Sequence, residues 1–163
     1  MYKKKPLFIT FEGIEGSGKS YQALRLYKNL KKKNISSILT REPGGTRSAE
    51  KIREVILKDY FHPESKEKFN KYTDTLLYLA ARNEHLENKI RPAIKKKKII
   101  ICDRFIDSTS AYQIYGKGVN KNFINSIHKY ILQGIKPNLT FVLIANISKA
   151  MKRLNRRKNK NRY

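Results

Sequence analysis

Short apolar runs alternate along the chain with longer segments in which apolar residues recur at every third or fourth position. The runs predict strands at residues 7–11, 35–40, 99–102 and 139–145, with the first, third and fourth of them buried. The longer segments predict helices at residues 19–33, from Thr46 or Ser48 to about 58, at 66–90, at 120–133 and from 148 to the end. Strands that alternate with helices predict an α/β fold, a parallel sheet flanked by helices in three layers.

The predicted helix at residues 66–90 is the longest element. Its apolar positions form a single stripe made of Phe69, Tyr72, Leu76, Leu79, Leu86 and Ile90. Pro92 follows directly and is expected to bend or end the helix. The chain shows no internal repeat, linker or domain boundary, so we expect one domain over residues 1–163.

The composition narrows the class of protein. No apolar run approaches the roughly 18 residues of a membrane span, and the run at residues 6–11 is too short for a signal peptide. We therefore expect a cytoplasmic protein with no membrane contact. Cys102 is the single cysteine, which excludes an internal disulfide, and the three histidines lack zinc-ligand spacing. A metal ion would need oxygen ligands.

The net charge is strongly positive. The chain has 37 Lys and Arg against 13 Asp and Glu, which gives a formal charge of +24. Such an excess suggests a polyanionic partner, but much of it lies in lysine runs at residues 31–33 and 95–98, which are typical of solvated surfaces. Binding to nucleic acid stays open and is not favoured.

One glycine-rich segment matches the phosphate-binding loop pattern G-x-x-x-x-G-K-[ST]. It lies between a predicted strand and a predicted helix, and it consists of Gly13, Ile14, Glu15, Gly16, Ser17, Gly18, Lys19 and Ser20. In such a loop the backbone N–H groups surround phosphate, the lysine bridges the β- and γ-phosphates and the hydroxyl is a ligand for Mg²⁺. We predict that this segment binds ATP.

A second pair of charged residues follows the buried strand at 99–102. Asp103 is placed where folds of this kind organise magnesium, and Arg104 could grip a phosphate with two hydrogen bonds. An ordinary turn pair after a strand is the alternative interpretation. The combination suits a site that joins two phosphate-bearing substrates.

Several motifs together resemble the thymidylate kinase family, in the family's order and over essentially all of the chain. They are the segments 11–20 (FEGIEGSGKS), 41–46 (REPGGT), 79–82 (LAAR), 103–105 (DRF) and 111–112 (AY). The resemblance implies a P-loop kinase that transfers the γ-phosphoryl group of ATP to dTMP, gives dTDP and ADP, requires Mg²⁺ and forms a homodimer.

The resemblance also implies which residues recognise the thymine base. Tyr78 and Arg82 lie four residues apart on one helical face, with His85 one turn further along. By similarity to the family, Tyr78 stacks on the base and Arg82 donates to a base oxygen. Spacing alone favours the alternative, in which Tyr78 is a core residue and Arg82 forms a surface ion pair. Thr109 is placed near the base, and Tyr112 would crowd the sugar 2′ position unless it is a packing residue.

Further residues are assigned to the acceptor by the same resemblance. Glu15 would bind the deoxyribose 3′-hydroxyl and help to place the acceptor phosphate, or it is a solvent-facing loop carboxylate. Arg53 and Arg104 would bind the phosphate of dTMP, since two cations suit one dianion.

Phosphoryl transfer commonly uses a further arginine to stabilise its transition state. Some family members carry it in the phosphate-binding loop, where this chain has Gly16, and others carry it in a lid. The chain resembles the second type. Arg153 and Arg157 are the leading candidates and Arg162 follows; a basic helix face or tail is the alternative.

Family members continue beyond the lid with another strand and helices, whereas Tyr163 falls inside the lid. We expect either a fragment or a shortened protein. A kinase with another nucleoside or nucleoside monophosphate as acceptor, and an inactive nucleotide- or nucleic-acid-binding protein, are the rival hypotheses.

Overall fold

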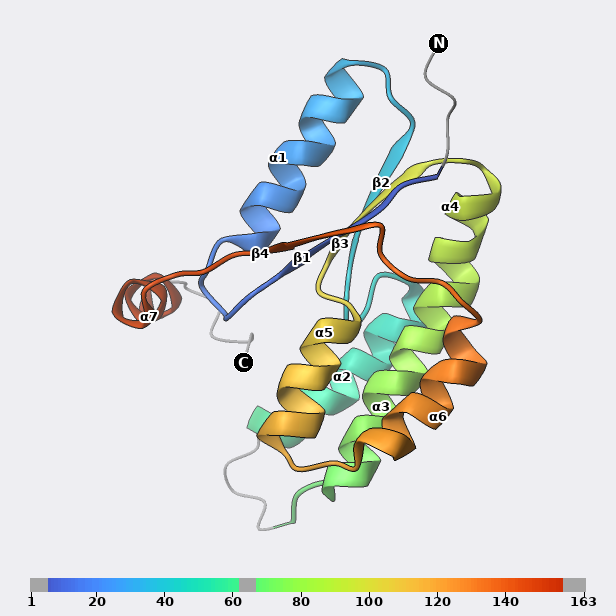
Figure 1. Ribbon diagram of the computed structural model, residues 1–163. Coiled ribbons are helices and arrows are strands. Elements are labelled where there is room, and N and C mark those ends of the chain that lie inside the picture. Colours follow the sequence, from blue (N-terminus) through green and yellow to red (C-terminus); the bar gives the residue numbers. More distant parts are fainter. Residues whose placement is uncertain (1–5, 62–66, 157–163) are drawn as a thin grey trace.

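The computed structural model describes residues 6–61 and 67–156, and its centre is a four-stranded sheet (Figure 1). The strands are β1 (Phe8–Glu12), β2 (Ser37–Arg41), β3 (Ile99–Asp103) and β4 (Leu139–Val142). They pair in the order β2-β3-β1-β4, and every pair is parallel. The carboxyl ends of all four strands therefore meet at one edge of the sheet, where α/β folds bind ligands.

Helices cover both faces of the sheet, and this confirms the predicted three-layer α/β fold. They are α1 (Lys19–Lys32), α2 (Arg47–Phe61), α3 (Lys71–His85), η1 (Leu86–Ile90), α4 (Arg91–Lys95), α5 (Ile106–Thr109), η2 (Ser110–Gly116), α6 (Lys121–Leu132) and α7 (Ile147–Asn155). Figure 1 shows α1 on one side of the sheet and α3, α4 and α6 on the other. Among the described helices none has the length and apolar character needed to span a bilayer.

Alternating side chains of β1 supply the cores of both layers. Phe8 belongs to a cluster with Leu86, Ile90 and Phe105, on the side of the sheet that carries η1 and α4. Ile9 and Phe11 point the other way and pack with Ala23 of α1. Because successive side chains of a strand face opposite sides, one short strand joins the two layers.

Four helices begin at a residue whose side chain accepts a backbone N–H. Thr46 accepts from Ala49 at the start of α2, so Thr46 rather than Ser48 caps this helix. Asn70, Asn120 and Asn146 do the same for α3, α6 and α7. Capping of this kind satisfies N–H groups that lack a partner inside the helix, which explains these boundaries.

The long helix differs from the prediction in two ways. It begins at Lys71 instead of residue 66, and it continues through a π-helical turn, η1, and through Pro92 to Lys95. Pro92 does not end the helix, and it lies in the first turn of α4, directly after the π-helical turn η1.

The predicted single apolar stripe is also wrong. Leu79, Leu86 and Ile90 are buried, whereas Leu76 remains 47% exposed. Phe69, which precedes α3, and Tyr72, in its first turn, are exposed as well, and Figure 1 shows this end of α3 extending beyond the sheet. The buried stripe is therefore restricted to the half that contacts the sheet.

Residues 139–145 were expected to be a buried strand, and this is wrong. β4 ends at Val142, and Leu139, Phe141 and Val142 are 44%, 43% and 65% exposed. Within the described residues β4 pairs only with β1, so it is an edge strand whose outward side chains face solvent.

Candidate active site

The glycine-rich loop connects the end of β1 to the start of α1 at the carboxyl edge of the sheet. Gly13 has φ 134°, and a Cβ there would lie 2.4 Å from the carbonyl oxygen of Leu143. Glycine is required because both the positive φ and the close backbone exclude a side chain. Lys19 opens α1, and its Nζ donates to the carbonyl oxygen of Ile14 at 2.7 Å, which brings the ammonium group back over the loop.

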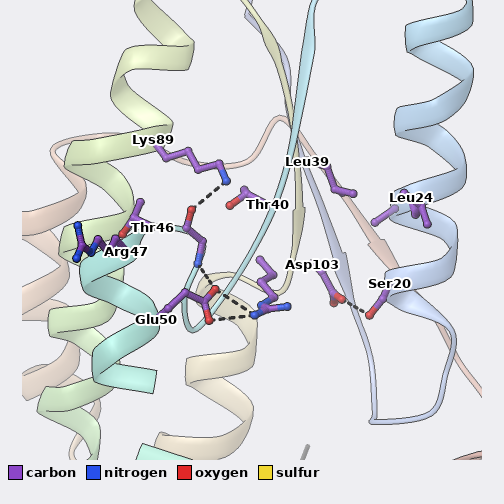
Figure 2. A pocket seen from close by; sticks show the side chains of 12 residues that line it. Ser20, Leu24, Leu39, Thr40, Thr46, Arg47, Glu50, Lys89 and Asp103 are labelled. Carbon is purple, nitrogen blue, oxygen red and sulfur yellow. Dashed lines mark hydrogen bonds and ion pairs between the residues drawn. The ribbon is translucent and has the colours of Figure 1, made fainter. Parts of the chain in front are cut away.

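Ser20 and Asp103 meet beside this loop. The Ser20 hydroxyl donates to Oδ2 of Asp103, the last residue of β3, and Figure 2 shows the two side chains facing each other. Oδ1 of Asp103 is buried and has no hydrogen-bond partner among the described residues. A hydroxyl and a carboxylate with an open coordination position fit Mg²⁺, which takes few protein ligands and completes its shell with water and phosphate oxygens. The described part of the chain holds no cluster of three or more His, Cys, Asp or Glu side chains for another kind of metal site.

The predicted phosphate-binding residues are brought together in one small cleft. It is lined by Glu15, Lys19, Ser20, Arg41, Glu42, Arg53, Asp103 and Arg104. Arg104 has φ 73°, and its guanidinium donates to Glu15 Oε2 and to Ser108 Oγ, each at 3.0 Å. Arg53 enters from α2 and donates to the carbonyl oxygen of Pro43 at 3.0 Å. Three arginines, a lysine and three acids thus surround a space suited to phosphate groups.

The electrostatics of the cleft favour an incoming anion. Burial lowers the pKa of Lys19, and the neighbouring charge of Arg104 lowers it further. Burial also acts to lower the pKa of Arg104, but Tyr112, Glu15 and Asp103 outweigh it and the pKa is raised. Repulsion between neighbouring cations in a low-dielectric cleft decreases when a polyanion enters. Phosphate binding is therefore favourable there.

A second pocket adjoins the phosphate cleft. It is lined by Glu42, Pro43, Tyr78, Arg104, Phe105, Ser108, Thr109, Tyr112 and Gln113. Arg104 and Glu42 line both cavities. The guanidinium of Arg104 lies over the ring of Tyr112, 5.3 Å from its centroid, so the pocket joins an aromatic wall to a phosphate-binding arginine.

Arg82 does not line this pocket, in contrast to Tyr78, Thr109 and Tyr112. It is 4% exposed and lies behind the wall. Its Nε donates to Glu42 Oε2 at 2.8 Å, and its Nη2 donates to the carbonyl oxygen of Phe105 at 3.0 Å. Both acceptors belong to residues of the pocket wall, so Arg82 supports the wall directly.

Sequence reasoning missed the buried acid at the centre of this network. Glu42 accepts from Arg82 and also contacts His85, whose Nδ1 is 3.0 Å from Glu42 Oε1 and whose Nε2 is 2.6 Å from Thr40 Oγ1. Burial acts to raise the pKa of Glu42, but Arg82 and His85 outweigh burial and lower it. The available signal was the acid in the REPGGT segment, together with Arg82 and His85 on one helical face.

Glu12 is a second missed residue. Its carboxylate accepts from the backbone N–H of Phe105 and from the hydroxyl of Ser108, each at 2.6 Å. Burial raises its pKa, while the two hydrogen bonds act in the opposite direction. Because Ser108 also accepts from Arg104, Glu12 holds the segment after β3 against the end of β1. Its position directly before Gly13 at a strand end was the available signal.

The helix α7 lies against the glycine-rich loop. A Cβ on Gly16 would come within 2.6 Å of the carbonyl oxygen of Ala150, so the loop position that lacks an arginine is where α7 packs. Nη1 of Arg153 donates to the carbonyl oxygen of Gly16 at 3.2 Å. Arg153 is thus beside the loop, whereas Arg157 and Arg162 lie outside the described residues.

A larger side pocket lies beyond Ser20 and Asp103, between α1, β2 and the start of α2 (Figure 2). Its wall includes a small polar network. Glu50 accepts from Arg41 at 2.9 Å and from the N–H of Gly45 at 2.8 Å, and Lys89 donates to the carbonyl oxygen of Gly45 at 2.9 Å. These contacts hold the 42–46 loop, which carries Glu42 and Pro43 to the catalytic cleft.

Comparisons with known proteins agree with one another. The family model for thymidylate kinase matches residues 11–163. A thymidylate kinase of Wolbachia from Brugia malayi is 46% identical, over 96% of this chain and 72% of that protein. One from Halothermothrix orenii is 44% identical, over 90% of this chain and 68% of that protein. The crystal structure of thymidylate kinase from Ehrlichia chaffeensis superposes with a TM-score of 0.76 at 37% identity, over 91% of this chain and 77% of that chain.

Proposed function

The chain belongs to the thymidylate kinase family and phosphorylates dTMP with ATP, and we propose how its residues divide this work. dTMP takes the pocket beside Tyr78 with its phosphate in the adjoining cleft. ATP approaches from the glycine-rich loop, so that the γ-phosphate of the donor and the phosphate of the acceptor meet near Arg104 and Lys19.

The observation that carries this proposal is the shared wall of the two cavities. Arg104 and Glu42 line both the aromatic pocket and the phosphate cleft. A nucleoside monophosphate has a flat base at one end and a dianion at the other, so one molecule would fill both spaces. Tyr78 and Tyr112 supply the aromatic surface for base and sugar, Thr109 supplies a hydroxyl near the base, and Arg53 and Arg104 pair with the phosphate.

On the donor side the proposal assigns roles to the loop and to two oxygen ligands. The backbone N–H groups of residues 13–20 and the positive end of the α1 dipole bind the phosphates of ATP, and Lys19 bridges the β- and γ-phosphates. Ser20 and Asp103 would hold Mg²⁺, directly or through water. When bound, Mg²⁺ neutralises charge on the transferring phosphates.

Catalysis follows from positioning and electrostatics, without a covalent intermediate. An oxygen of the dTMP phosphate attacks the γ-phosphorus in line with the oxygen that leaves with ADP. Arg53 and Arg104 hold the attacking phosphate, and Glu15, through its hydrogen bond to Arg104, keeps that guanidinium in place. Arg153 is the lid arginine closest to the loop among the described residues and would stabilise the charge of the transition state.

An acceptor panel tests the proposed acceptor site. ADP formation from ATP would be measured with dTMP, dUMP, UMP, dCMP and thymidine. We expect dTMP to give the largest kcat/KM and thymidine to give none, because thymidine lacks the phosphate that Arg53 and Arg104 bind. Faster turnover of UMP than of dTMP would contradict the roles given to Tyr112 and Thr109.

We also propose a homodimer that forms through the outer faces of α2 and α3. Val55 on α2 and Leu76 on α3 are 45% and 47% exposed, and a shallow pocket between the same two helices includes Ile52 and Ala80. Large exposed apolar side chains on neighbouring helices favour association with a matching surface. Light scattering of the protein and of a Leu76→Glu variant tests this: the dimer mass should be lost in the variant.

A cytoplasmic location is part of the same proposal. ATP and dTMP are multiply charged metabolites that do not cross membranes unaided, so an enzyme that uses both would work where they are made. Fractionation of cells that express the protein would test the location.

A further inference from the structure

His128 makes a contact to which the proposed function assigns no role. It lies on α6, which runs beside α3 in Figure 1, and its Nε2 is 2.8 Å from Nη1 of Arg82, although the two residues are 46 positions apart in sequence. His128 is partly buried, and it brings a third element to an arginine that the 42–46 loop and Phe105 already hold.

The chemistry of this contact determines the state of the imidazole. An arginine only donates hydrogen bonds, so Nε2 of His128 must accept and the ring proton must be on Nδ1. Burial lowers the pKa of His128 to about 4, and the charge of Arg82 contributes to the shift. The ring is therefore neutral near pH 7 and is able to accept from the guanidinium.

Three acceptors hold the three nitrogens of Arg82. Nε and Nη2 lie near Glu42 Oε2, at 2.8 and 2.7 Å, and Nη2 also donates to Phe105. His128 lies at hydrogen-bond distance from Nη1. A guanidinium is planar, so an acceptor at Nη1 restricts rotation of the whole group about its contacts with Glu42 and Phe105.

We propose that His128 is a positioning residue that holds the guanidinium of Arg82 against the wall of the base pocket. The inference rests on the proposed function, in which dTMP occupies the pocket lined by Tyr78, Glu42 and Phe105. Glu42 and Phe105 accept from Nε and Nη2 of Arg82, and His128 keeps the Nη1 end in place, so that Glu42 and Phe105 stay at the wall. The shape of the pocket is thereby controlled partly from α6, outside the pocket.

Substitution of His128 gives the first test. We expect His128→Ala to raise the KM for dTMP about tenfold, the size expected for one lost hydrogen bond to a charged group, with kcat and the KM for ATP within about twofold of wild type. His128→Gln should restore much of the KM for dTMP, since its amide oxygen can accept from Nη1. Tyr130→Ala, at a 77% exposed position of the same helix, is the matched control and should leave this KM unchanged.

A double-mutant cycle separates positioning from packing. If His128 acts through Arg82, His128→Ala should have little further effect on dTMP in an Arg82→Lys background, which keeps a charge beside Glu42 but lacks the planar fork. Equal effects in both backgrounds would overturn the inference, as would wild-type kinetics for His128→Ala or a failure of His128→Gln to rescue.

The same cycle distinguishes the two levels of the proposal. If Arg82→Lys leaves the KM for dTMP unchanged, Arg82 does not support the acceptor pocket, and the place proposed for dTMP beside this wall is wrong. If Arg82→Lys raises this KM and His128→Ala does not, the role of His128 alone is wrong. Thermal unfolding of each variant identifies losses that come from misfolding, and His128→Gln then remains the informative variant should His128→Ala fail to fold.

Discussion

The proposed base side and the proposed lid side of the cleft are built differently. On the proposed base side, Arg82, Glu42 and His85 are buried and joined by hydrogen bonds that connect α3 to the 42–46 loop. On the proposed lid side, α7 is largely exposed, with Ile147 and Met151 at 72% and 51%, and the side chain of Arg153 donates from α7 to the glycine-rich loop.

This difference fits the division of roles proposed above. A dense buried network would hold the proposed acceptor side in place before substrate arrives, so that dTMP meets a formed pocket. An element with few buried contacts shifts at low cost, which suits the proposed role of α7 as a lid that brings Arg153 to the transition state. Substitutions on the base side should therefore affect both stability and acceptor binding, whereas substitutions on the loop and lid should affect turnover.

The largest effect is expected from Lys19→Ala. Loss of the ammonium that bridges the transferring phosphates should reduce kcat at least about 10³-fold, as for other cations that stabilise phosphoryl transfer. The fold should be retained, so circular dichroism and the unfolding midpoint should stay close to wild type. Lys28→Ala, at an exposed position of α1, is the matched control. Undiminished turnover would contradict the donor site.

On the base side, Arg82→Ala should lower the free energy of unfolding, in addition to weakening dTMP binding. It leaves the Glu42 carboxylate buried without its main partner, and breaking a buried pair in this way costs about 3–5 kcal/mol. Urea unfolding measures the loss. The double variant Arg82→Ala with Glu42→Gln should recover part of it, because no buried charge is then left unpaired. A single variant as stable as wild type would show that the base side is not the rigid half.

A smaller effect on turnover is expected from Arg153→Ala. Removal of one cation that stabilises the transition state should lower kcat about 10²-fold, with little change in unfolding free energy because Arg153 is exposed. Lys152→Ala, its exposed neighbour on α7, should remain within about twofold. If the two variants behave alike, the lid arginine lies elsewhere, and Arg157 and Arg162 become the next substitutions to make.

The smallest expected effect is a pH dependence of stability. The pKa of His128 is lowered from 6.5 to about 4 by burial and by Arg82, so the unfolded chain binds a proton more readily than the folded protein between these values. Stability from this residue is complete above about pH 6.5 and is lost as the pH falls toward 4. We expect about 1–2 kcal/mol after allowance for solvent screening.

His128→Gln supplies the comparison for this pH effect. The variant lacks the titrating ring, so its unfolding free energy should fall less between pH 6.5 and 4 than that of wild type. The pKa of Glu42 is also shifted, but Glu42 is present in both proteins. Its contribution therefore cancels when the unfolding free energies of the two proteins are subtracted. If the unfolding free energies of the two proteins fell in parallel with decreasing pH, the fold would not be keeping His128 neutral.

Much of the fold and of the donor site was predictable because the signals are local. A strand, a glycine-rich turn and a helix follow one another within residues 8–32, and the loop geometry requires its glycines there. The continuous apolar run before Asp103 predicts a central strand with an acid at its carboxyl end, as found in β3. Such features depend on neighbours in sequence, so they were enough to determine the parallel α/β order. The meeting of Ser20 with Asp103, 83 positions apart, then follows because the carboxyl ends of parallel strands share one edge of the sheet.

Tertiary structure alone decided the rest. The exposure of β4 depends on its place at the sheet edge, and the packing of α7 on Gly16 joins segments more than a hundred residues apart. The partners of Arg82 come from the 42–46 loop, from the residue after Arg104 and from α6. Hydrogen bonds between such distant segments leave no periodic signal, because they depend on how helices pack on the sheet. Spacing on α3 could place Arg82 on a face but could not show that the face is turned into the protein.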